Sequence, residues 1–412
     1  MAAADPLKIL PAQLPPPPDG RTLLLAVGKA AASMALAVEQ NWPADRKLFG
    51  IALTRYGHAL SLERVRWVEA GHPVPDEAGA QAAHEMLGAA RAIKSVDLLL
   101  ALISGGGSAL LSLPVEGISL GDLRKVTQDL LRSGASIQEI NTVRKHLSQI
   151  QGGRLAAACK APVLALIISD VTGDDPTHIA SGPCAPDPTT FQEAVDVLNR
   201  FDVKPPLAVL EHLICGLRGE REETPKPGAK VFDRVENRVI ATARHSLDAA
   251  AALFRANGVE PVILGDSITG EAKEVAKVMA ALTREIRGHG APFKPPVALL
   301  SGGECTVSVR SIGGRGGRCA EFLLALGIEL AGTAAVHAIA ADTDGIDGSE
   351  DNAGALLAPD TLARAGALGM DARKFLAAND SYGFFSALSD LVVTGPTRTN
   401  VNDYRAILIT PA

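Results

Sequence analysis

One apolar run that ends in serine and three glycines constrains the fold of this chain more than any other feature. Residues 98–103 read Leu-Leu-Leu-Ala-Leu-Ile, and Ser104-Gly105-Gly106-Gly107-Ser108 follows directly. A buried parallel strand delivers the chain to the carboxyl edge of a sheet, where glycines let backbone N–H groups approach a ligand. A tight turn that uses glycine only for its positive φ is the alternative. We interpret Ser104 to Ser108 as an anion-binding loop.

The second half of the chain contains a shorter copy of this pattern. Residues 297–300 form another apolar run, and Ser301-Gly302-Gly303-Glu304 follows it. Two such loops that face each other would form a cleft for a phosphorylated or carboxylated small molecule.

Short apolar runs alternate with alanine-rich stretches such as residues 77–92 along the whole chain. This alternation, with 47% hydrophobic but only 4% aromatic residues, predicts an α/β fold with a doubly wound, mostly parallel sheet. The expected strands cover residues 23–27, 50–53, 65–68, 96–103, 163–168, 239–243, 262–264, 297–300, 336–340, 391–394 and 406–409.

The best linker candidate is the charged segment 218–230, which contains Pro225, Pro227 and Gly228. We therefore predict two domains, an amino-terminal α/β domain over residues 1–228 and a carboxyl-terminal α/β domain over residues 229–412. Cys305 to Arg310 alternates between polar and apolar residues directly after a strand, which suggests a hairpin and a mixed sheet in the second domain.

Charge and cysteine content exclude several classes of partner. The net charge is -6 and no long basic run occurs, so no footprint for nucleic acid or for an anionic membrane is present. Five cysteines without a close pair in the sequence argue against a disulfide framework. The first residues lack the order of a signal peptide, in which charged residues precede an apolar segment. We expect a cytoplasmic protein with a small-molecule ligand, and both a monomer and a homodimer stay open.

Basic residues occur at three places where an anion could bind. Lys29 follows the first expected strand and opens a helix, although a solvated first-turn lysine would look the same. Arg318 ends the glycine-rich run Gly313-Gly314-Arg315-Gly316-Gly317. Arg144 and Lys145 share a polar stripe on a helix that the capping box Ser136 to Glu139 opens and that we expect to end at Gly152-Gly153. A solvated helix face is the simpler explanation of that stripe, and steering of an anion is the second.

Acidic residues cluster after another expected strand. Asp342, Asp344 and Asp347 lie within one short segment, where Mg²⁺ and a nucleotide phosphate could meet. A capped, glycine-rich turn explains such a segment equally well. Asp170, which follows the strand at residues 163–168, belongs to a second acidic segment that could hold the metal instead.

The ordered set of these motifs resembles the ATP-dependent glycerate 2-kinases, whose members are sometimes labelled hydroxypyruvate reductases. The resemblance covers nearly the whole chain from Leu23 onward. The matching runs are Val27-Gly28-Lys29-Ala30, Ala70-Gly71-His72-Pro73-Val74-Pro75-Asp76, the stretches 102–108, 140–148 and 343–348, Gly316-Gly317-Arg318, Thr394-Gly395-Pro396-Thr397, and Thr399-Asn400-Val401-Asn402-Asp403.

The resemblance implies an α/β amino-terminal domain, a carboxyl-terminal MOFRL domain, and transfer of the ATP γ-phosphoryl group to the 2-hydroxyl of D-glycerate with Mg²⁺. It points to Lys29 and Arg318 as catalytic residues that face each other across a cleft between the domains, and it adds Asn400 to the substrate-binding and phosphate-binding candidates. Cys319 departs from the family, where an asparagine is common at this position. An NAD(P)H-dependent hydroxypyruvate reductase is the alternative, although Leu110 stands where the third glycine of a dinucleotide fingerprint should be.

Overall fold

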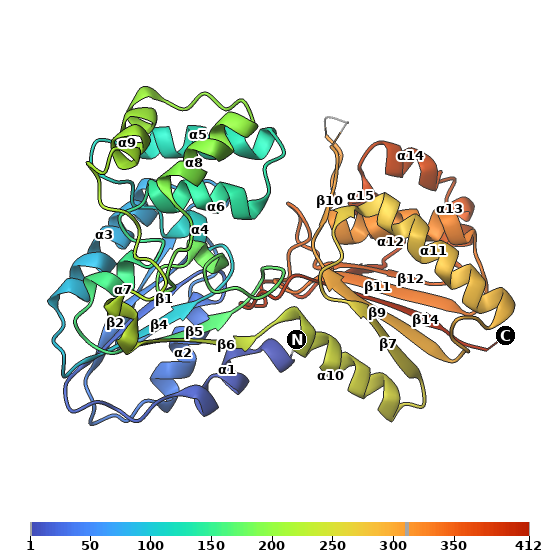
Figure 1. The fold of residues 1–412 in the computed structure, drawn as a ribbon. Helices are drawn as coiled ribbons and strands as arrows, with labels where there is room; N and C mark the ends of the chain where they lie inside the picture. The colour runs from blue at the N-terminus through green and yellow to red at the C-terminus, as the bar shows by residue number, and fades with distance from the viewer. Residues whose placement is uncertain (1, 310–312, 412) are drawn as a thin grey trace. The chain divides into compact units, whose positions relative to one another are not determined.

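The computed structural model describes residues 2–309 and 313–411, and the chain divides into two compact units (Figure 1). One unit runs from Asp5 to Ala241. The other begins at Thr242 and also contains the short helix η1 (Ala2–Ala4). Each unit has its own sheet and its own hydrophobic core, so each is described separately.

The first unit is built on a six-stranded sheet with the order β3-β2-β1-β4-β5-β6, and every pair in it is parallel. Strands β1, β4 and β5 are buried along their whole length and are apolar except for Thr22, as expected for strands covered on both faces. The predicted doubly wound parallel sheet is confirmed. The strands are β1 (Thr22–Val27), β2 (Leu48–Arg55), β3 (Val65–Ala70), β4 (Leu98–Ile103), β5 (Val163–Ile168) and β6 (Val235–Ala241).

This strand order creates a topological switch point between β1 and β4. After β1 the chain moves outward through β2 and β3, and it then returns to place β4 on the other side of β1. Connections leave the two central strands in opposite directions, which opens a crevice at their carboxyl ends, where ligands of α/β sheets bind. Lys29 and the glycine loop from Ser104 to Ser108 follow these two strands.

Helices of the first unit form the layers on the sheet and a separate cluster (Figure 1). Helices α5, α6, α8 and α9 share a hydrophobic core of their own and lie beyond the end of the sheet where α4 lies. The helices are α1 (Pro6–Ile9), α2 (Ala31–Asn41), α3 (Glu77–Ala92), α4 (Gly107–Leu110), α5 (Leu120–Arg132), α6 (Ile137–His146), α7 (Arg154–Ala158), α8 (Phe191–Arg200) and α9 (Leu207–Leu217), with the short helices η2 (Pro11–Gln13), η3 (Ile179–Ser181) and η4 (Lys230–Arg234).

Helix α6 begins at the predicted capping box but ends earlier than predicted. The Ser136 hydroxyl accepts the N–H of Glu139, while the Glu139 carboxylate accepts the N–H of Ser136. The helix stops at His146 rather than at the glycines 152–153, because the Ser148 hydroxyl accepts the N–H groups of Ile150 and Gln151 and turns the chain.

The second unit contains a six-stranded mixed sheet with the order β13-β12-β11-β14-β9-β7. Strand β14 runs antiparallel to both of its neighbours, while β7 and β9 are parallel. The predicted mixed sheet is confirmed. The strands of this unit are β7 (Glu260–Gly265), β8 (Gly270–Glu271), β9 (Val297–Gly303), β10 (Cys305–Thr306), β11 (Val336–Asp342), β12 (Gly354–Leu357), β13 (Leu391–Val392) and β14 (Asp403–Ile409).

Helices cover the two faces of the second sheet unequally. In Figure 1, α11 and α12 lie over one face and α10 lies over the other. The larger core lies under α11 and α12, and a smaller cluster around Leu247 and Leu300 lies under α10. The helices are α10 (Ala243–Ala256), α11 (Ala272–His289), α12 (Arg318–Leu330), α13 (Thr361–Ala367), α14 (Ala372–Ala377) and α15 (Ser381–Ala387).

Two local expectations were wrong. The strand expected at residues 239–243 is β6, which pairs with β5 and is the last strand of the first sheet rather than part of the second half. The structure therefore divides the chain at Ala241/Thr242, while the domain boundary at 228/229 stays a prediction. The expected hairpin over 305–310 is a two-residue strand, β10, that pairs in parallel with β8, and Arg310 lies outside the described residues.

None of the helices in the described ranges combines the length and apolarity that crossing a lipid bilayer requires.

Two glycines of helix α3 provide a test of this packing. Gly88 is exposed and a Cβ there would meet nothing within 4 Å, so Gly88→Ala should stabilise the protein by about 0.5–1 kcal/mol through helix propensity. At Gly79 a Cβ would lie 2.8 Å from the carbonyl oxygen of Leu110, so Gly79→Ala should destabilise by about 1–3 kcal/mol. Urea denaturation of both variants measures the difference. Equal effects at the two positions would contradict the close contact of α3 with α4.

Candidate functional site

Backbone contacts hold the ends of β1 and β4 together at the switch point. The N–H of Ser104 donates to the carbonyl of Val27 at 3.0 Å, and the N–H of Lys29 donates to the carbonyl of Gly105 at 2.8 Å. The Ser104 hydroxyl accepts the N–H of Ala30 at 3.0 Å. Ala30 is the N-cap residue of α2, and its own side chain forms no capping hydrogen bond. Gly28 has φ of 118°, and a Cβ there would lie 2.3 Å from the Ser104 hydroxyl oxygen. These contacts fix the backbone of Lys29 beside the glycine loop.

The side chains of Lys29 and His72 lie against Gly106. A Cβ at Gly106 would lie 3.0 Å from His72 Nε2 and 3.3 Å from Lys29 Cγ, and the residue has φ of 81°. A larger residue would therefore be strained and would push on both side chains. His72 lies in the loop that follows β3, so residues that follow three strands of the sheet meet at this point. The sequence analysis named Lys29 and the glycine loop as separate candidates, and it did not single out His72.

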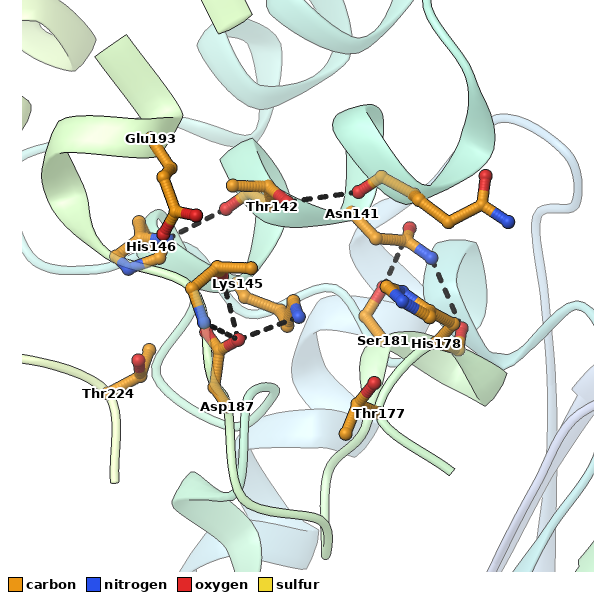
Figure 2. Close-up of polar contacts among 12 residues, drawn as sticks. Asn141, Thr142, Lys145, His146, Thr177, His178, Ser181, Asp187, Glu193 and Thr224 are labelled. Carbon is orange, nitrogen blue, oxygen red and sulfur yellow. Dashed lines mark hydrogen bonds and ion pairs between the residues drawn. The ribbon is translucent and has the colours of Figure 1, made fainter. Parts of the chain in front are cut away.

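A chain of polar contacts links the glycine loop to helix α6. The Ser181 hydroxyl lies 2.8 Å from the Ser108 hydroxyl. It also lies 3.1 Å from Asn141 Oδ1, while Asn141 Nδ2 donates to the carbonyl of His178 (Figure 2). Arg144 Nη1 donates to the same Asn141 oxygen at 3.4 Å. The predicted binding residues Ser108 and Arg144 therefore belong to one network, which also includes Ser181 and Asn141.

Lys145 has a different environment from Arg144. Its side chain is fully buried, and its ammonium donates to the equally buried Asp187 at 2.8 Å (Figure 2). Burial alone would raise the pKa of Asp187, but Lys145 and the hydrogen bonds from Thr189 hold it below its ordinary value. The simpler interpretation of the polar stripe as a solvated face was wrong for Lys145 and Asn141, which are both buried. Direct contact of Lys145 with a ligand is not available in this conformation.

Arg318 is the centre of the polar cluster in the second unit. The register places Asp342 of β11, Asp403 of β14 and Gly303 of β9 side by side at one edge of the sheet. Arg318 is the first residue of α12 and reaches this edge, where Nη2 donates to Asp342 at 2.7 Å and Nε donates to Asp403 at 2.8 Å. Nη1 lies 3.3 Å from Glu304. Burial would lower the pKa of Arg318, but the three carboxylates raise it above its usual range and keep the guanidinium charged.

Asp347 fixes the start of helix α12. Its two carboxylate oxygens accept the N–H groups of Cys319 at 3.0 Å and Ala320 at 2.8 Å, which lack partners within the helix. A Cβ at Gly317 would lie 2.2 Å from Asp347 Oδ1, so only glycine fits directly before Arg318. Burial raises the pKa of Asp347 to about 7, although these N–H donors favour the charged form. The Cys319 side chain lies in the hydrophobic core beneath.

The three predicted metal ligands each have protein partners in this structure. Asp347 caps α12, and Asp342 pairs with Arg318 and accepts the N–H of Asp344. Asp344 Oδ1 accepts the N–H of Ile346. No group of three His, Cys, Asp or Glu side chains within residues 2–309 and 313–411 is arranged to hold a metal ion. In this structure Asp347 orients a helix and Asp342 orients a guanidinium, and a role of the three carboxylates as metal ligands stays a prediction. Asp170, the other candidate, is half-buried after β5.

Asn400 lies in a loop that packs on the acidic segment. Its Oδ1 accepts the N–H of Asn402, and its side chain is buried. The Thr343 hydroxyl donates to the carbonyl of Asn402 and accepts the N–H of Val401. The structure thus places Asn400 in the same unit as Arg318, next to the predicted acidic segment.

The second Ser-Gly-Gly run has a packing role that the sequence did not indicate. The buried Arg405 donates from Nη2 to the carbonyls of Gly302 and Gly303, at 3.1 Å each. A Cβ at Gly303 would lie 2.4 Å from the backbone of Ile268. The glycines therefore let two backbone segments and an arginine approach each other, and a role of this run in ligand binding stays a prediction.

Comparison with known proteins finds relatives that match nearly the whole chain. Residues 1–214 match a family described as a domain of unknown function (DUF4147), and residues 297–403 match the MOFRL family. A protein of Agrobacterium vitis, provisionally named a hydroxypyruvate reductase, is 50% identical over 99% of this chain and 92% of its own length. Glycerate 2-kinase of Pyrococcus horikoshii is 42% identical over 95% of this chain and 88% of its own length. The crystal structure of a glycerate kinase from Thermotoga maritima has a TM-score of 0.87 and 38% identity, covering 99% of this chain and 96% of that one.

The buried pair of Lys145 and Asp187 generates a stability prediction. Lys145→Met should destabilise the protein by about 3–5 kcal/mol at neutral pH, because Asp187 stays buried without its cation. The loss should shrink as the pH falls toward about 4, since the uncompensated carboxyl then takes up a proton and the wild-type pair loses its advantage. Thermal unfolding at several pH values measures this trend.

Lys125→Met is the matched control for that variant. Lys125 forms a pair of the same 2.8 Å length with Asp129, but its side chain is 59% exposed, so its replacement should cost about 1 kcal/mol or less. Similar losses in the two variants, or a loss in Lys145→Met that is independent of pH, would contradict the assigned charge pair.

Proposed function

This chain belongs to the glycerate 2-kinase family that carries a MOFRL domain, and from that premise we propose that it transfers the γ-phosphoryl group of ATP to the 2-hydroxyl of D-glycerate. The observation that carries the proposal is the likeness, over nearly the full length of both chains, to proteins named glycerate 2-kinase and glycerate kinase. The resemblance recognised from the sequence motifs is confirmed.

The proposed chemistry needs positive charge and positioning more than it needs a covalent step. Phosphoryl transfer spreads negative charge over the phosphoryl oxygens, and fixed cations stabilise that charge. We assign this role to Lys29, which the glycine loop holds at the switch point, and to Arg318, which Asp342 and Asp403 orient. Ser104 to Ser108, Arg144 and Asn400 stay proposed contacts of substrate and phosphate, while Lys145 supports the site through Asp187.

The nucleotide and its metal belong to the proposal. We infer that ATP is the phosphoryl donor and that it arrives with Mg²⁺ as part of the substrate, where the ion bridges phosphate oxygens. The carboxylates at Asp342, Asp344 and Asp347 have protein partners in this structure, and no step is assigned to a metal held by the protein. Five free cysteines support a reducing compartment such as the cytoplasm. A monomer and a homodimer fit equally well.

Reduction of hydroxypyruvate is the second candidate, because the Agrobacterium vitis relative carries that provisional name. The turns after β1 and β4 argue against a dinucleotide site and therefore against this reduction. A dinucleotide fold of this type binds its pyrophosphate at the first glycine-rich turn, after β1, and only Gly28 is present there. After β4, Leu110 replaces the third glycine of the fingerprint.

A pair of assays separates the two candidates. With D-glycerate, ATP and Mg²⁺ the purified protein should form ADP and a phosphoglycerate whose phosphate is on the 2-hydroxyl, as NMR of the product would show. With hydroxypyruvate and NADH or NADPH it should oxidise no cofactor. Turnover of NAD(P)H with no formation of ADP would overturn the proposal.

Lys29 provides the sharpest test of the site in the first unit. Lys29→Ala should lower kcat by ~100-fold or more, because a cation that stabilises the transferring group is lost, while the melting temperature changes little. Lys160→Ala is the control, since Lys160 is an exposed lysine that precedes β5. It lies at the amino-terminal ends of the strands, while Lys29 follows the carboxyl end of β1. Near-normal turnover of Lys29→Ala would remove this residue from the mechanism.

A further inference from the structure

Arg144 is a cation in a partly buried position whose described contacts are with neutral groups. Its Nε lies 3.5 Å from the Thr127 hydroxyl and its Nη1 lies 3.4 Å from Asn141 Oδ1, both near the limit of a hydrogen bond. Among the residues that the structure describes, no carboxylate forms an ion pair with this guanidinium. Burial accordingly lowers the pKa of Arg144 to about 10 with no acidic group to offset the effect.

Such a position is costly unless an anion binds there. Removing a guanidinium from water without a counter-charge costs free energy, and proteins retain such groups where a ligand supplies the charge. Arginine also presents a rigid fork of N–H donors that matches the two oxygens of a carboxylate. The two long contacts of Arg144 leave most of that fork unused by the described residues.

The neighbours of Arg144 extend this donor set toward the glycine loop. Asn141 Oδ1 contacts the Ser181 hydroxyl (Figure 2). The same oxygen contacts Arg144, and Ser181 contacts the half-buried Ser108. Ser181 has a positive φ of 58°, a conformation that costs energy in a residue other than glycine and that occurs often at ligand sites. The network therefore connects Arg144 with Ser108, the last residue of the glycine loop.

Two buried polar atoms of the same segment have no hydrogen-bond partner in the described structure. They are Thr177 Oγ1 and His178 Nδ1, which lie directly before η3, the short helix that ends in Ser181 (Figure 2). Buried polar atoms normally have a partner, so a bound ligand or water completes such a place. The orphaned atoms and the unpaired cation thus occur on two elements that Asn141 connects, because its Nδ2 donates to the carbonyl of His178.

We propose that Arg144, supported by Asn141, forms with Ser108 and Ser181 a subsite for the carboxylate of a small hydroxy acid. The proposal rests on the proposed function for the identity of that acid. In this proposal Arg144 selects the acceptor by binding its carboxylate. Lys29 and Arg318 stabilise the transferring phosphoryl group. A phosphate of the nucleotide is the other anion that could bind a guanidinium, and the experiment separates the two sources.

The test compares acceptor and donor kinetics in variants of Arg144. Arg144→Gln should raise the KM for D-glycerate by ~10-fold or more, while the KM for ATP changes less than ~2-fold. The preference of the wild type for D-glycerate over its neutral amide should shrink by a similar factor, which a merely structural role of Arg144 would not produce. Arg144→Lys should recover part of the affinity, because the charge returns without the fork.

Controls distinguish the possible failures. Arg132→Gln removes an exposed arginine at the end of the neighbouring helix α5 and should leave both KM values unchanged. A raised KM for ATP with an unchanged KM for D-glycerate would assign Arg144 to the nucleotide and overturn the inference. So would an unchanged preference for the acid over its amide. If the wild type phosphorylates no glycerate, the proposed function fails first, and calorimetric titration with D-glycerate and with hydroxypyruvate still decides whether Arg144 binds a three-carbon carboxylate.

If Arg144→Gln does not fold, Arg144→Lys and the wild-type comparison of acid and amide carry the test. Equal binding of the acid and the amide by the wild type would then contradict the subsite.

Discussion

Parallel pairing of β1 with β4 is the constraint on which the site in the first unit depends. All six residues of each strand are in register and buried, so their ends cannot move independently. Ser104 then closes the pair, because its hydroxyl accepts the N–H of Ala30 while its own N–H donates to Val27. The position of Lys29 therefore follows from strand packing, and a flexible loop plays little part in it. This explains how a short motif can fix the backbone from which a charged side chain extends.

Electrostatics has the same organising role in the second unit. Arg318 would be costly to bury alone, and three carboxylates from different segments offset that cost. Asp347 contributes indirectly, since it holds the first turn of α12 and thereby the backbone of Arg318. The Gly-Gly-Arg run is thus explained by contact rather than by flexibility, because the space beside Gly317 is filled by Asp347. The surrounding carboxylates orient the Arg318 guanidinium and favour its charged form.

The sequence predicted local features well and partners across the chain poorly. Helix α3 covers residues 77–92 as expected, and the fully apolar strands β4 and β5 were recognisable because their pattern is local. Lys145 illustrates the opposite case. Its helical stripe looked like a solvated face because its partner Asp187 lies 42 residues away and carries no local signal. The capping role of Asp347 was hidden for the same reason, since its partners Cys319 and Ala320 lie on another element.

Strand β6 has a consequence for any attempt to study the first unit alone. It follows the charged, proline-containing segment that looks like a natural place to divide the chain, yet it supplies the last strand of the parallel sheet. A fragment that ends at residue 228 would leave β5, which reads Val-Leu-Ala-Leu-Ile-Ile, as a bare edge. An uncovered apolar edge offers unpaired backbone groups to other chains and promotes aggregation. A fragment that ends after Ala241 keeps the edge covered by β6, whose residues before Ala241 are partly exposed and include Glu236 and Arg238.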